Sequence, residues 1–379
     1  MRKKISVSTP LLGHLELEAV SRVLRKGEIS GTFGECISKF ENKFSSFVGC
    51  KYGVAVPNGT LALHLALATI NIKPGDEVLV STLTNMATIF AIRYVGGVPV
   101  PIDIEKDTWN LNPALLEMNV SRKTRAILVV HLFGHPVDMD PVIQIAKKYK
   151  LYVIEDAAQA HGAEYKGKRV GSLGDIACFS FYANKILTTG EGGMVVTNNK
   201  NFAERARLLG TLSYGNRRNR FMHKEIGFNY RMSNIHAAIG LSQLQRIERV
   251  ISLKAKIARM YNHLLKEIEG IQLPIQKEYA KNVYWMYHIV LQKPFHGRRD
   301  AVMESLLSRG IETRQSFVPA NAQKIFIKEG LMRKESCPVA NYVGANGFYL
   351  PSGPVISPAE IKYVAKTISN VMLEMESKK

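Results

Sequence analysis

The first two-thirds of this chain alternates short apolar runs with helical patterns, and this feature constrains the fold most strongly. Six runs rich in β-branched and other apolar residues are predicted as strands, at residues 77–80, 98–102, 126–130, 152–155, 177–181 and 194–197. Amphipathic stretches such as residues 141–148 lie between several of them. Strands separated by helices favour a mainly parallel sheet with both faces covered. We therefore expect an α/β fold whose ligands bind beyond the carboxyl ends of the strands.

The pattern changes beyond about residue 250, where longer helical segments surround a few isolated strands. A chain of 379 residues is long for a single hydrophobic core. We expect a large α/β domain over residues 1–250 and a smaller C-terminal α+β domain over residues 251–379. A long helical pattern at residues 234–264 connects the two.

The apolar runs, the first residues and the cysteines indicate where the protein works and whether it binds a metal. No apolar run approaches the roughly 18 residues that a membrane-spanning helix needs, and the basic start at residues 1–5 lacks the apolar stretch of a signal peptide. The four cysteines show no paired metal-binding spacing such as C-x-x-C. We expect a cytoplasmic protein with reduced cysteines, no membrane span and no metal site.

The formal net charge of +19 is spread along the chain, apart from a denser cluster at Arg217, Arg218 and Arg220. A nucleic-acid binder would concentrate its basic residues and interleave them with aromatic ones. We interpret the charge as a solvated basic surface and expect no nucleic-acid partner. A local site for the diphosphate of a sugar nucleotide is the alternative at the arginine cluster, because arginine pairs well with phosphate.

Three segments carry residues suited to chemistry. In the first, Pro57-Asn58-Gly59-Thr60 leads directly into the helical pattern at residues 61–68. A small-residue turn that opens a helix leaves backbone N–H groups unpaired at the positive end of the helix dipole, which favours phosphate. An ordinary helix cap without a ligand, with Asn58 or Thr60 capping, is the alternative.

The second segment runs from a predicted buried strand into Asp156, then small residues, Gln159 and His161. Asp156 stands at the carboxyl end of the strand, where a catalytic acid would lie. It could equally serve as the N-cap of a following helix.

The third segment places Lys185 between a predicted strand and the glycine-rich turn at residues 190–193, with Ser180 five residues earlier. A lone lysine among apolar residues is usually a surface side chain with a buried stem. Desolvation, however, lowers the pKa of a lysine and exposes the neutral amine that Schiff-base chemistry requires. The glycines would let the backbone pass close to a flat ring. The chain has no G-x-G-x-x-G motif that would indicate a nicotinamide cofactor.

Together these segments resemble the DegT/DnrJ/EryC1/StrS family of sugar aminotransferases, which depend on pyridoxal 5′-phosphate (PLP). The resemblance extends from residues 31–34 to residues 350–352. It implies the type I aspartate-aminotransferase fold, with a mainly parallel seven-stranded sheet in the large domain. Within the family, residues 179–196 and 227–234 look most like the corresponding segments of GDP-perosamine synthases.

The resemblance also implies roles for individual residues. Lys185 matches the lysine that binds the cofactor and then moves protons, and Asp156 matches the carboxylate that pairs with the pyridinium nitrogen. Gln159 matches the residue near the phenolic oxygen of the ring.

Further matches concern the ends of the cofactor. Gly59, Thr60 and Ser180 match phosphate contacts. Asn229 matches a residue that reaches the phosphate from a neighbouring subunit, which implies a homodimer, or a dimer of dimers, with shared active sites. Met86 occupies the region where many relatives place an aromatic or larger apolar residue against the ring.

The expected reaction is the transfer of an amino group from glutamate to C4 of a nucleotide-linked 4-keto-6-deoxy sugar for surface polysaccharide synthesis. GDP-4-keto-6-deoxymannose is the preferred acceptor, with GDP-perosamine as product, and Arg217, Arg220 and Arg314 are the candidate substrate contacts. UDP- or dTDP-linked keto sugars remain open, because residues 315–321 depart from the family pattern where they would shape the sugar pocket.

Two other classes of protein are alternatives to a sugar aminotransferase. A sugar dehydratase on the same fold is disfavoured because those relatives carry histidine in place of the lysine. A non-enzymatic basic protein would require the combination of Asp156, Gln159 and Lys185 to be coincidental.

Overall fold

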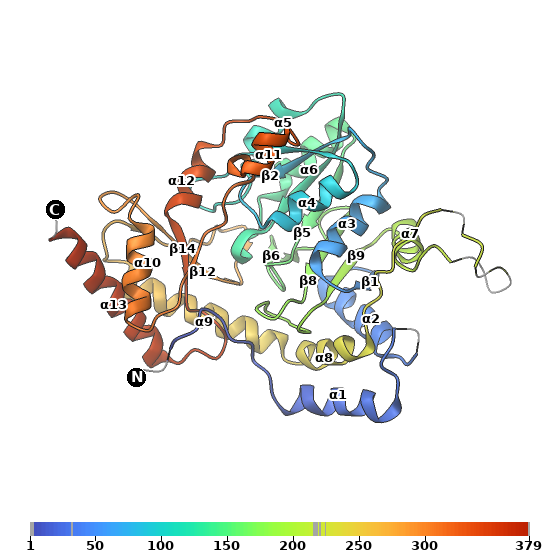
Figure 1. Ribbon diagram of the computed structural model, residues 1–379, viewed down its shortest axis with the longest axis horizontal. Helices are drawn as coiled ribbons and strands as arrows, with labels where there is room; N and C mark the ends of the chain where they lie inside the picture. Colours follow the sequence, from blue (N-terminus) through green and yellow to red (C-terminus); the bar gives the residue numbers. More distant parts are fainter. Residues whose placement is uncertain (1–3, 32, 215–218, 220, 224, 378–379) are drawn as a thin grey trace.

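The structure is a computed structural model that describes residues 4–31, 33–214, 219, 221–223 and 225–377 (Figure 1). Its centre is a seven-stranded sheet of order β1-β9-β8-β5-β4-β2-β3. The strands are β1 (Tyr52–Val56), β2 (Glu77–Ser81), β3 (Val98–Ile102), β4 (Thr124–Val130), β5 (Tyr152–Asp156), β8 (Ile176–Ser180) and β9 (Gly193–Thr197).

The strands of this sheet are parallel except β9, which runs antiparallel to both of its neighbours, β1 and β8. The predicted mainly parallel sheet is therefore confirmed, and the six apolar runs correspond to six of its strands. The seventh strand, β1, was not predicted. It contains Gly53, and glycine weakens the pattern by which a strand is recognised.

Alternate residues of the strands enter two different cores, as expected for a sheet covered on both faces. Leu128 and Val130 of β4 join the core that includes α3 (Gly59–Thr69) and α4 (Met86–Tyr94). Ile127 and Val129 join a separate core with α5 (Leu116–Asn119) and α6 (Met139–Tyr149). The connecting helices α7 (Lys200–Gly210) and α2 (Cys36–Val48) contact β1 and β9 at the other end of the sheet.

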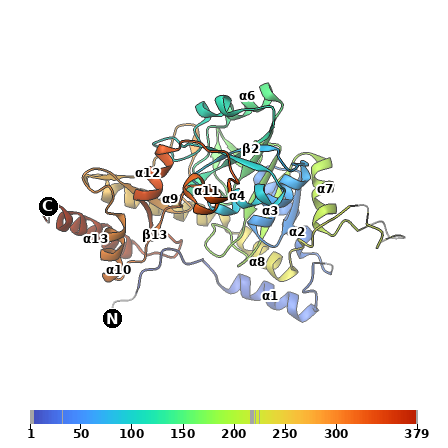
Figure 2. The ribbon, with the colours of Figure 1, turned by 45° about the horizontal axis from the view of Figure 1, so that its top comes forward.

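A second, antiparallel sheet of order β10-β12-β14-β13 belongs to the C-terminal part of the chain. Its strands are β10 (Ile271–Gln272), β12 (Tyr287–Leu291), β14 (Gly347–Leu350) and β13 (Arg314–Gln315). Helices α10 (Arg299–Ser308) and α13 (Pro358–Glu376) lie beside it, at the end of the molecule where both termini are found (Figures 1 and 2). Short strands β6 (Glu164–Tyr165), β7 (Lys168–Arg169) and β11 (Ala280–Lys281) form a third sheet. The remaining helices of this part are α11 (Lys324–Glu329) and α12 (Pro338–Asn346).

The helical pattern at residues 234–264 is two helices, α8 (Asn234–Leu244) and α9 (Ile247–Leu265), rather than one. At the break, the Arg246 guanidinium donates to the carbonyl of Leu11 and pairs with Glu16 of α1 (His14–Lys26). The first turns of α9 pack in the large core and its later turns in the small one, where Ile5 also packs. The division into two domains at residue 250 remains a prediction. The N-terminal segment does not follow this division, because Ile5 packs in the core of the C-terminal part.

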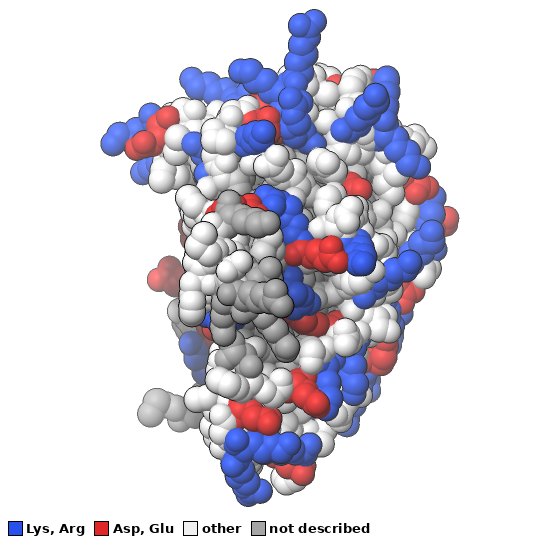
Figure 3. All heavy atoms as spheres, turned by 90° about the vertical axis from the view of Figure 1, so that its right-hand side faces the viewer, with Lys and Arg blue, Asp and Glu red and all other residues white. Residues whose placement is uncertain are grey.

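Basic side chains are distributed over the surface. On the face shown in Figure 3, Lys and Arg side chains stand at the top, along the right-hand side, in the middle and at the bottom, with Asp and Glu side chains among them. Many pair with carboxylates, as Lys148 does with Glu117 and Arg205 with Glu225. Within the described part of the chain, no helix has the length and apolar character to cross a membrane.

Packing predicts a large effect for Phe44, which is fully buried among Phe40, Phe179 and Phe181. Phe44→Ala should lower the free energy of unfolding by about 3–5 kcal/mol, because it leaves a cavity in a packed core. Leu373→Ala, at an exposed position on α13, should change it by less than about 0.5 kcal/mol. Denaturant unfolding measures both, and similar values for the two variants would contradict this account.

Burial predicts a pH-dependent stability through Lys254 on α9, whose ammonium donates to the carbonyl of Ser352. Burial lowers the pKa of this lysine from 10.5 to about 7. The unfolded chain therefore binds a proton at a higher pH than the folded one, so stability falls as the pH drops from 10.5 toward 7. Lys254→Met should remove this dependence, which amounts to about 5 kcal/mol over the whole range. Unfolding curves of both proteins across that range measure it, and identical pH profiles would contradict it.

Candidate active site

A cavity of about 430 Å³ opens at the carboxyl ends of the central strands. It brings together residues that are far apart in the sequence. Seven of the predicted site residues line it: Gly59, Thr60, Asp156, Gln159, Ser180, Lys185 and Arg314.

One end of the cavity is the N-terminus of α3. The Asn58 side chain accepts a hydrogen bond from the Leu61 N–H at 2.9 Å, so the predicted cap is present. Gly59 and Thr60 still border the cavity, next to the Ser180 hydroxyl at the end of β8. A Cβ on Gly59 would lie only 2.7 Å from Ser180 Cβ, so glycine is required for this approach. Helix N–H groups and a hydroxyl together form a site for an anion such as phosphate.

Gly193 lies against the backbone of the same turn, at Asn58 and Gly59. A Cβ there would come within 2.5 Å of the Asn58 carbonyl oxygen. The glycines after Lys185 were predicted to make room for a flat ring. The structure gives Gly193 a different role, since it makes room for the backbone that carries the anion site.

Asp156 is buried at the carboxyl end of β5. Its Oδ2 accepts from the Thr88 hydroxyl at 2.8 Å, and its Oδ1 accepts from the Ala158 N–H at 3.1 Å. Burial raises the pKa of this carboxyl, whereas the two hydrogen bonds and the Lys185 charge act in the opposite direction. Asp156 does not cap a helix, because no helix follows β5 directly.

Gln159 is oriented by an unusual stretch of backbone. Its Oε1 accepts from the N–H of Phe133 at 2.8 Å, which leaves the side-chain NH₂ as the donor end toward the cavity. Phe133 has a positive φ of 54° and stacks on His288 with ring centroids 4.3 Å apart. The loop after β4 thereby fixes which hydrogen-bonding group Gln159 can offer.

Lys185 enters the cavity from the turn after β8. Its Nζ lies 3.8 Å from the centroid of the Trp285 ring, and Trp285 Nε1 donates to the Asn184 carbonyl at 2.9 Å. Burial lowers the pKa of Lys185 to about 8, and Asp156 partly offsets this effect. About a tenth of the amine is therefore in the neutral form at pH 7, and this is the form that nucleophilic chemistry requires.

The C-terminal part of the chain supplies another wall through Arg314, Phe317 and Tyr349. These three residues also line an adjoining cavity of about 540 Å³, which opens further toward the surface. Met86 borders this outer cavity, whereas Ala87 and Thr88 border the inner one. Together the two cavities provide an inner chamber and a wider entrance.

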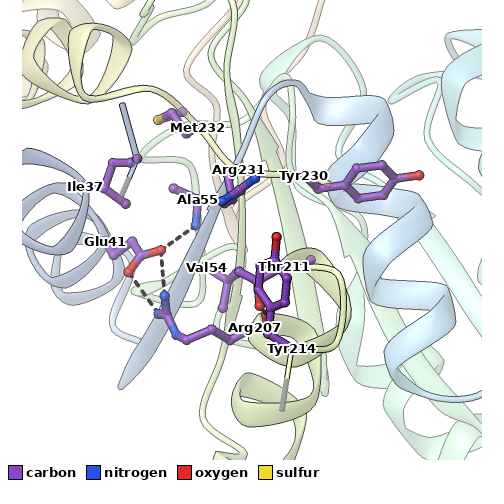
Figure 4. Close-up of a pocket in the computed structure, with 12 residues that line it drawn as sticks. Ile37, Glu41, Val54, Ala55, Arg207, Thr211, Tyr214, Tyr230, Arg231 and Met232 are labelled. Atoms are coloured by element: carbon purple, nitrogen blue, oxygen red, sulfur yellow. Dashed lines mark hydrogen bonds and ion pairs between the residues drawn. The ribbon is translucent and has the colours of Figure 1, made fainter. Parts of the chain in front are cut away.

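Asn229 lies elsewhere, exposed and bonded through Oδ1 to Arg231 Nε at 2.9 Å. The adjacent residues Tyr230, Arg231 and Met232 line a separate cavity of about 200 Å³ (Figure 4). In that cavity Arg207 points at Glu41, which it holds through an ion pair of 2.9 Å. Asn229 does not border the Lys185 cavity of its own chain. Arg217 and Arg220 lie outside the described residues.

Several residues of the inner cavity were not among the predicted site residues. They include Thr88, Tyr182, Asn184, Trp285 and Tyr349. Trp285 and Tyr349 follow no local motif, and only the approach of the C-terminal part brings them to Lys185. Among the residues that the structure describes, no cluster of three or more His, Cys, Asp or Glu side chains could hold a metal ion.

Comparisons with known proteins agree with this geometry. The family model described as "DegT/DnrJ/EryC1/StrS aminotransferase family" matches residues 10–369. The GDP-perosamine synthase of Escherichia coli O157:H7 is 40% identical, over 97% of this chain and 98% of its own length. The UDP-2-acetamido-2-deoxy-3-oxo-D-glucuronate aminotransferase of Pseudomonas aeruginosa is 35% identical, over 93% of this chain and 94% of its own length.

Among solved structures, an aminotransferase from Psychrobacter cryohalolentis superimposes with a TM-score of 0.90 and 32% identity, covering 97% of this chain and 99% of that one. The predicted type I fold and PLP dependence are thereby confirmed. The chain is a PLP-dependent sugar aminotransferase and belongs to the DegT/DnrJ/EryC1/StrS family.

Proposed function

We propose that this enzyme transfers an amino group from glutamate to C4 of GDP-4-keto-6-deoxymannose, and that the product, GDP-perosamine, enters surface polysaccharide synthesis. The position of Lys185, with a lowered pKa and opposite Asp156 in one cavity, supports amino transfer most directly. Similarity to a GDP-perosamine synthase over nearly the whole chain supports the choice of sugar.

The residues of the inner cavity fit PLP as a set. Gly59, Thr60 and Ser180 would hold its phosphate, Asp156 its ring nitrogen and Gln159 its phenolic oxygen. These groups supply donors for the anionic phosphate at one end and a carboxylate for a protonated nitrogen at the other. When bound, PLP supplies a carbonyl that captures amines and a ring that withdraws electrons from the substrate carbon.

Lys185 would act twice. With a pKa of about 8, roughly a tenth of the amine is neutral at pH 7 and can serve as the nucleophile that attaches the cofactor. Its Nζ would also accept a proton from, or return one to, the reacting carbon of the donor or acceptor. Trp285, packed at 3.8 Å, limits the directions in which this amine can move and excludes water from one side.

The outer cavity suits the remainder of a nucleotide sugar, because about 540 Å³ adjoins the chamber that holds Lys185. Arg314 stands between the two cavities and can pair with a diphosphate or a carboxylate. Gln315 and Ser316, which depart from the family pattern, line the entrance. They are therefore placed to influence which sugar is accepted.

A UDP-linked keto sugar is the second candidate, since a relative 35% identical is named for amino transfer to a UDP-linked 3-oxo sugar. A dTDP-linked sugar is a third candidate within the same class. The cofactor chemistry would be the same for all of these acceptors, and they would differ only in their contacts with the entrance.

The enzyme would work as a homodimer, or a dimer of dimers, in the cytoplasm. Asn229 is exposed and does not line the Lys185 cavity of its own chain. If it contacts a cofactor phosphate, that cofactor must belong to a second subunit.

Replacement of Lys185 tests the cofactor attachment. The wild-type protein reconstituted with PLP should be yellow, and Lys185→Ala should lose the absorption band of the covalent complex and at least about 1,000-fold in amino transfer, since nucleophile and proton carrier are removed together. Lys254→Met is the control, because it removes another buried lysine outside this cavity. A Lys185→Ala protein that kept the band would overturn the assignment.

The acceptor is tested with a panel of GDP-, UDP- and dTDP-linked 4-keto sugars and a UDP-linked 3-keto sugar, with glutamate as donor. Mass spectrometry should detect an aminated product chiefly from GDP-4-keto-6-deoxymannose, at a kcat/KM at least about tenfold above the others, because poorly matched contacts cost roughly 1.4 kcal/mol or more. Amination of the 3-keto sugar alone would refute the proposed C4 specificity.

A further inference from the structure

We infer that Thr84 and Thr88 form a hydroxyl pair that keeps Asp156 ionised and oriented toward the cofactor ring. This inference rests on the proposed placement of Asp156 at the ring nitrogen. It assigns a positioning role to two residues that the family resemblance did not mark.

The two threonines are placed by the start of α4. Asn85 caps this helix by accepting from the Ala87 N–H at 2.9 Å, so Thr84 lies just before the helix and Thr88 in its first turn. The two residues are four positions apart, and their hydroxyl oxygens are 2.9 Å apart. Both residues are almost completely buried, with exposed fractions of 1% and 0%.

The donor and the acceptor in each of these hydrogen bonds follow from the number of hydrogens available. Each hydroxyl has one hydrogen to donate. When Asp156 is ionised it can only accept, so Thr88 must donate its hydrogen to Oδ2, at 2.8 Å. The contact between the two threonines then requires Thr84 to donate to Thr88. Such a chain is polarised toward the carboxylate, and each hydrogen bond strengthens the next.

A carboxylate in this position needs such support. Burial raises the pKa of Asp156, and the Thr88 hydroxyl is the foremost group that opposes the shift. The Ala158 N–H serves the other oxygen, Oδ1. Each oxygen thus has one protein donor and retains a free lone pair. The carboxylate can therefore still accept from a protonated ring nitrogen.

The alternative is that the two threonine hydroxyls only provide each other with a hydrogen-bond partner in a buried turn. In that case their loss would weaken the protein or the cavity as a whole. The two explanations differ in whether the effect depends on the ring nitrogen.

The experiment compares the affinity of the apoenzyme for PLP with its affinity for 1-deaza-PLP, in which carbon replaces the ring nitrogen. Thr88→Val keeps the shape of the side chain but removes the donor. It should weaken PLP binding about tenfold, as expected for a hydrogen bond to a charged group, and change 1-deaza-PLP binding less than about twofold. Thr88→Ser should restore the affinity for PLP. Thr84→Val, which removes only the outer hydroxyl, should weaken PLP binding about threefold.

Asp156→Asn is the reference variant, since it should abolish the preference for PLP over its deaza analogue. If it does so and neither threonine variant lowers that preference, the hydroxyl pair has no positioning role. If Asp156→Asn leaves the preference unchanged, the placement of Asp156 is wrong and the inference fails with it. Should Thr88→Val not fold, Thr84→Val and Thr88→Ser decide the question by the same ratio.

Discussion

The pairing of β5 with β8 is the interaction on which the active site depends. These strands are parallel neighbours, with Asp156 opposite Cys178 in the register. Their chains therefore leave the sheet at the same edge, so the carboxylate that ends β5 and the hydroxyl that ends β8 face one cavity. The turn after β8 then carries Lys185 back toward Asp156. A shift of one residue in this pairing would exchange the two faces of a strand and direct these side chains into opposite layers.

Burial acts on the two charged groups of the cavity in opposite ways. It raises the pKa of Asp156 and lowers that of Lys185, so desolvation alone would favour the neutral form of each. For Lys185 this direction is useful, because the neutral amine is the nucleophile. For Asp156 it is a cost, because a carboxylate is needed to stabilise a protonated ring. Thr88 and Ala158 donate hydrogen bonds to Asp156, which favours its ionised form. Lys185 instead packs against the face of Trp285.

Glycine has a structural purpose at the two places where the anion site is built. Gly59 lets Ser180 approach the start of α3, and Gly193 lets the neighbouring strand pass beneath Asn58. Any side chain at either position would push these segments apart. The site proposed for the phosphate is thus made by close approach of backbone, and the site proposed for the ring by buried side chains.

Much of the fold and the inner site could be predicted from local sequence. Period and length of the apolar runs indicated six of the seven central strands, and strand-end polar residues such as Asp156 and Ser180 indicated the edge at which the cavity opens. The helix break at Arg246 could not be predicted, because it follows from contacts with Leu11 and Glu16 more than 200 residues earlier. The roles of Thr88 and Trp285 were equally hidden, since neither belongs to a local motif and each gains its partner from another part of the chain.

The sequence by itself determined the residue types of the site, the parallel sheet and the chemistry that a buried lysine permits. These depend on short-range patterns and on the identity of single side chains. Only the tertiary structure decided which groups support them: the Thr84 and Thr88 hydroxyls behind Asp156, the Phe133 backbone that orients Gln159, and the Trp285 ring over Lys185. The physical reason is that hydrogen bonds and desolvation act over a few ångströms in space, and the distances along the chain between these partners carry no information about that proximity.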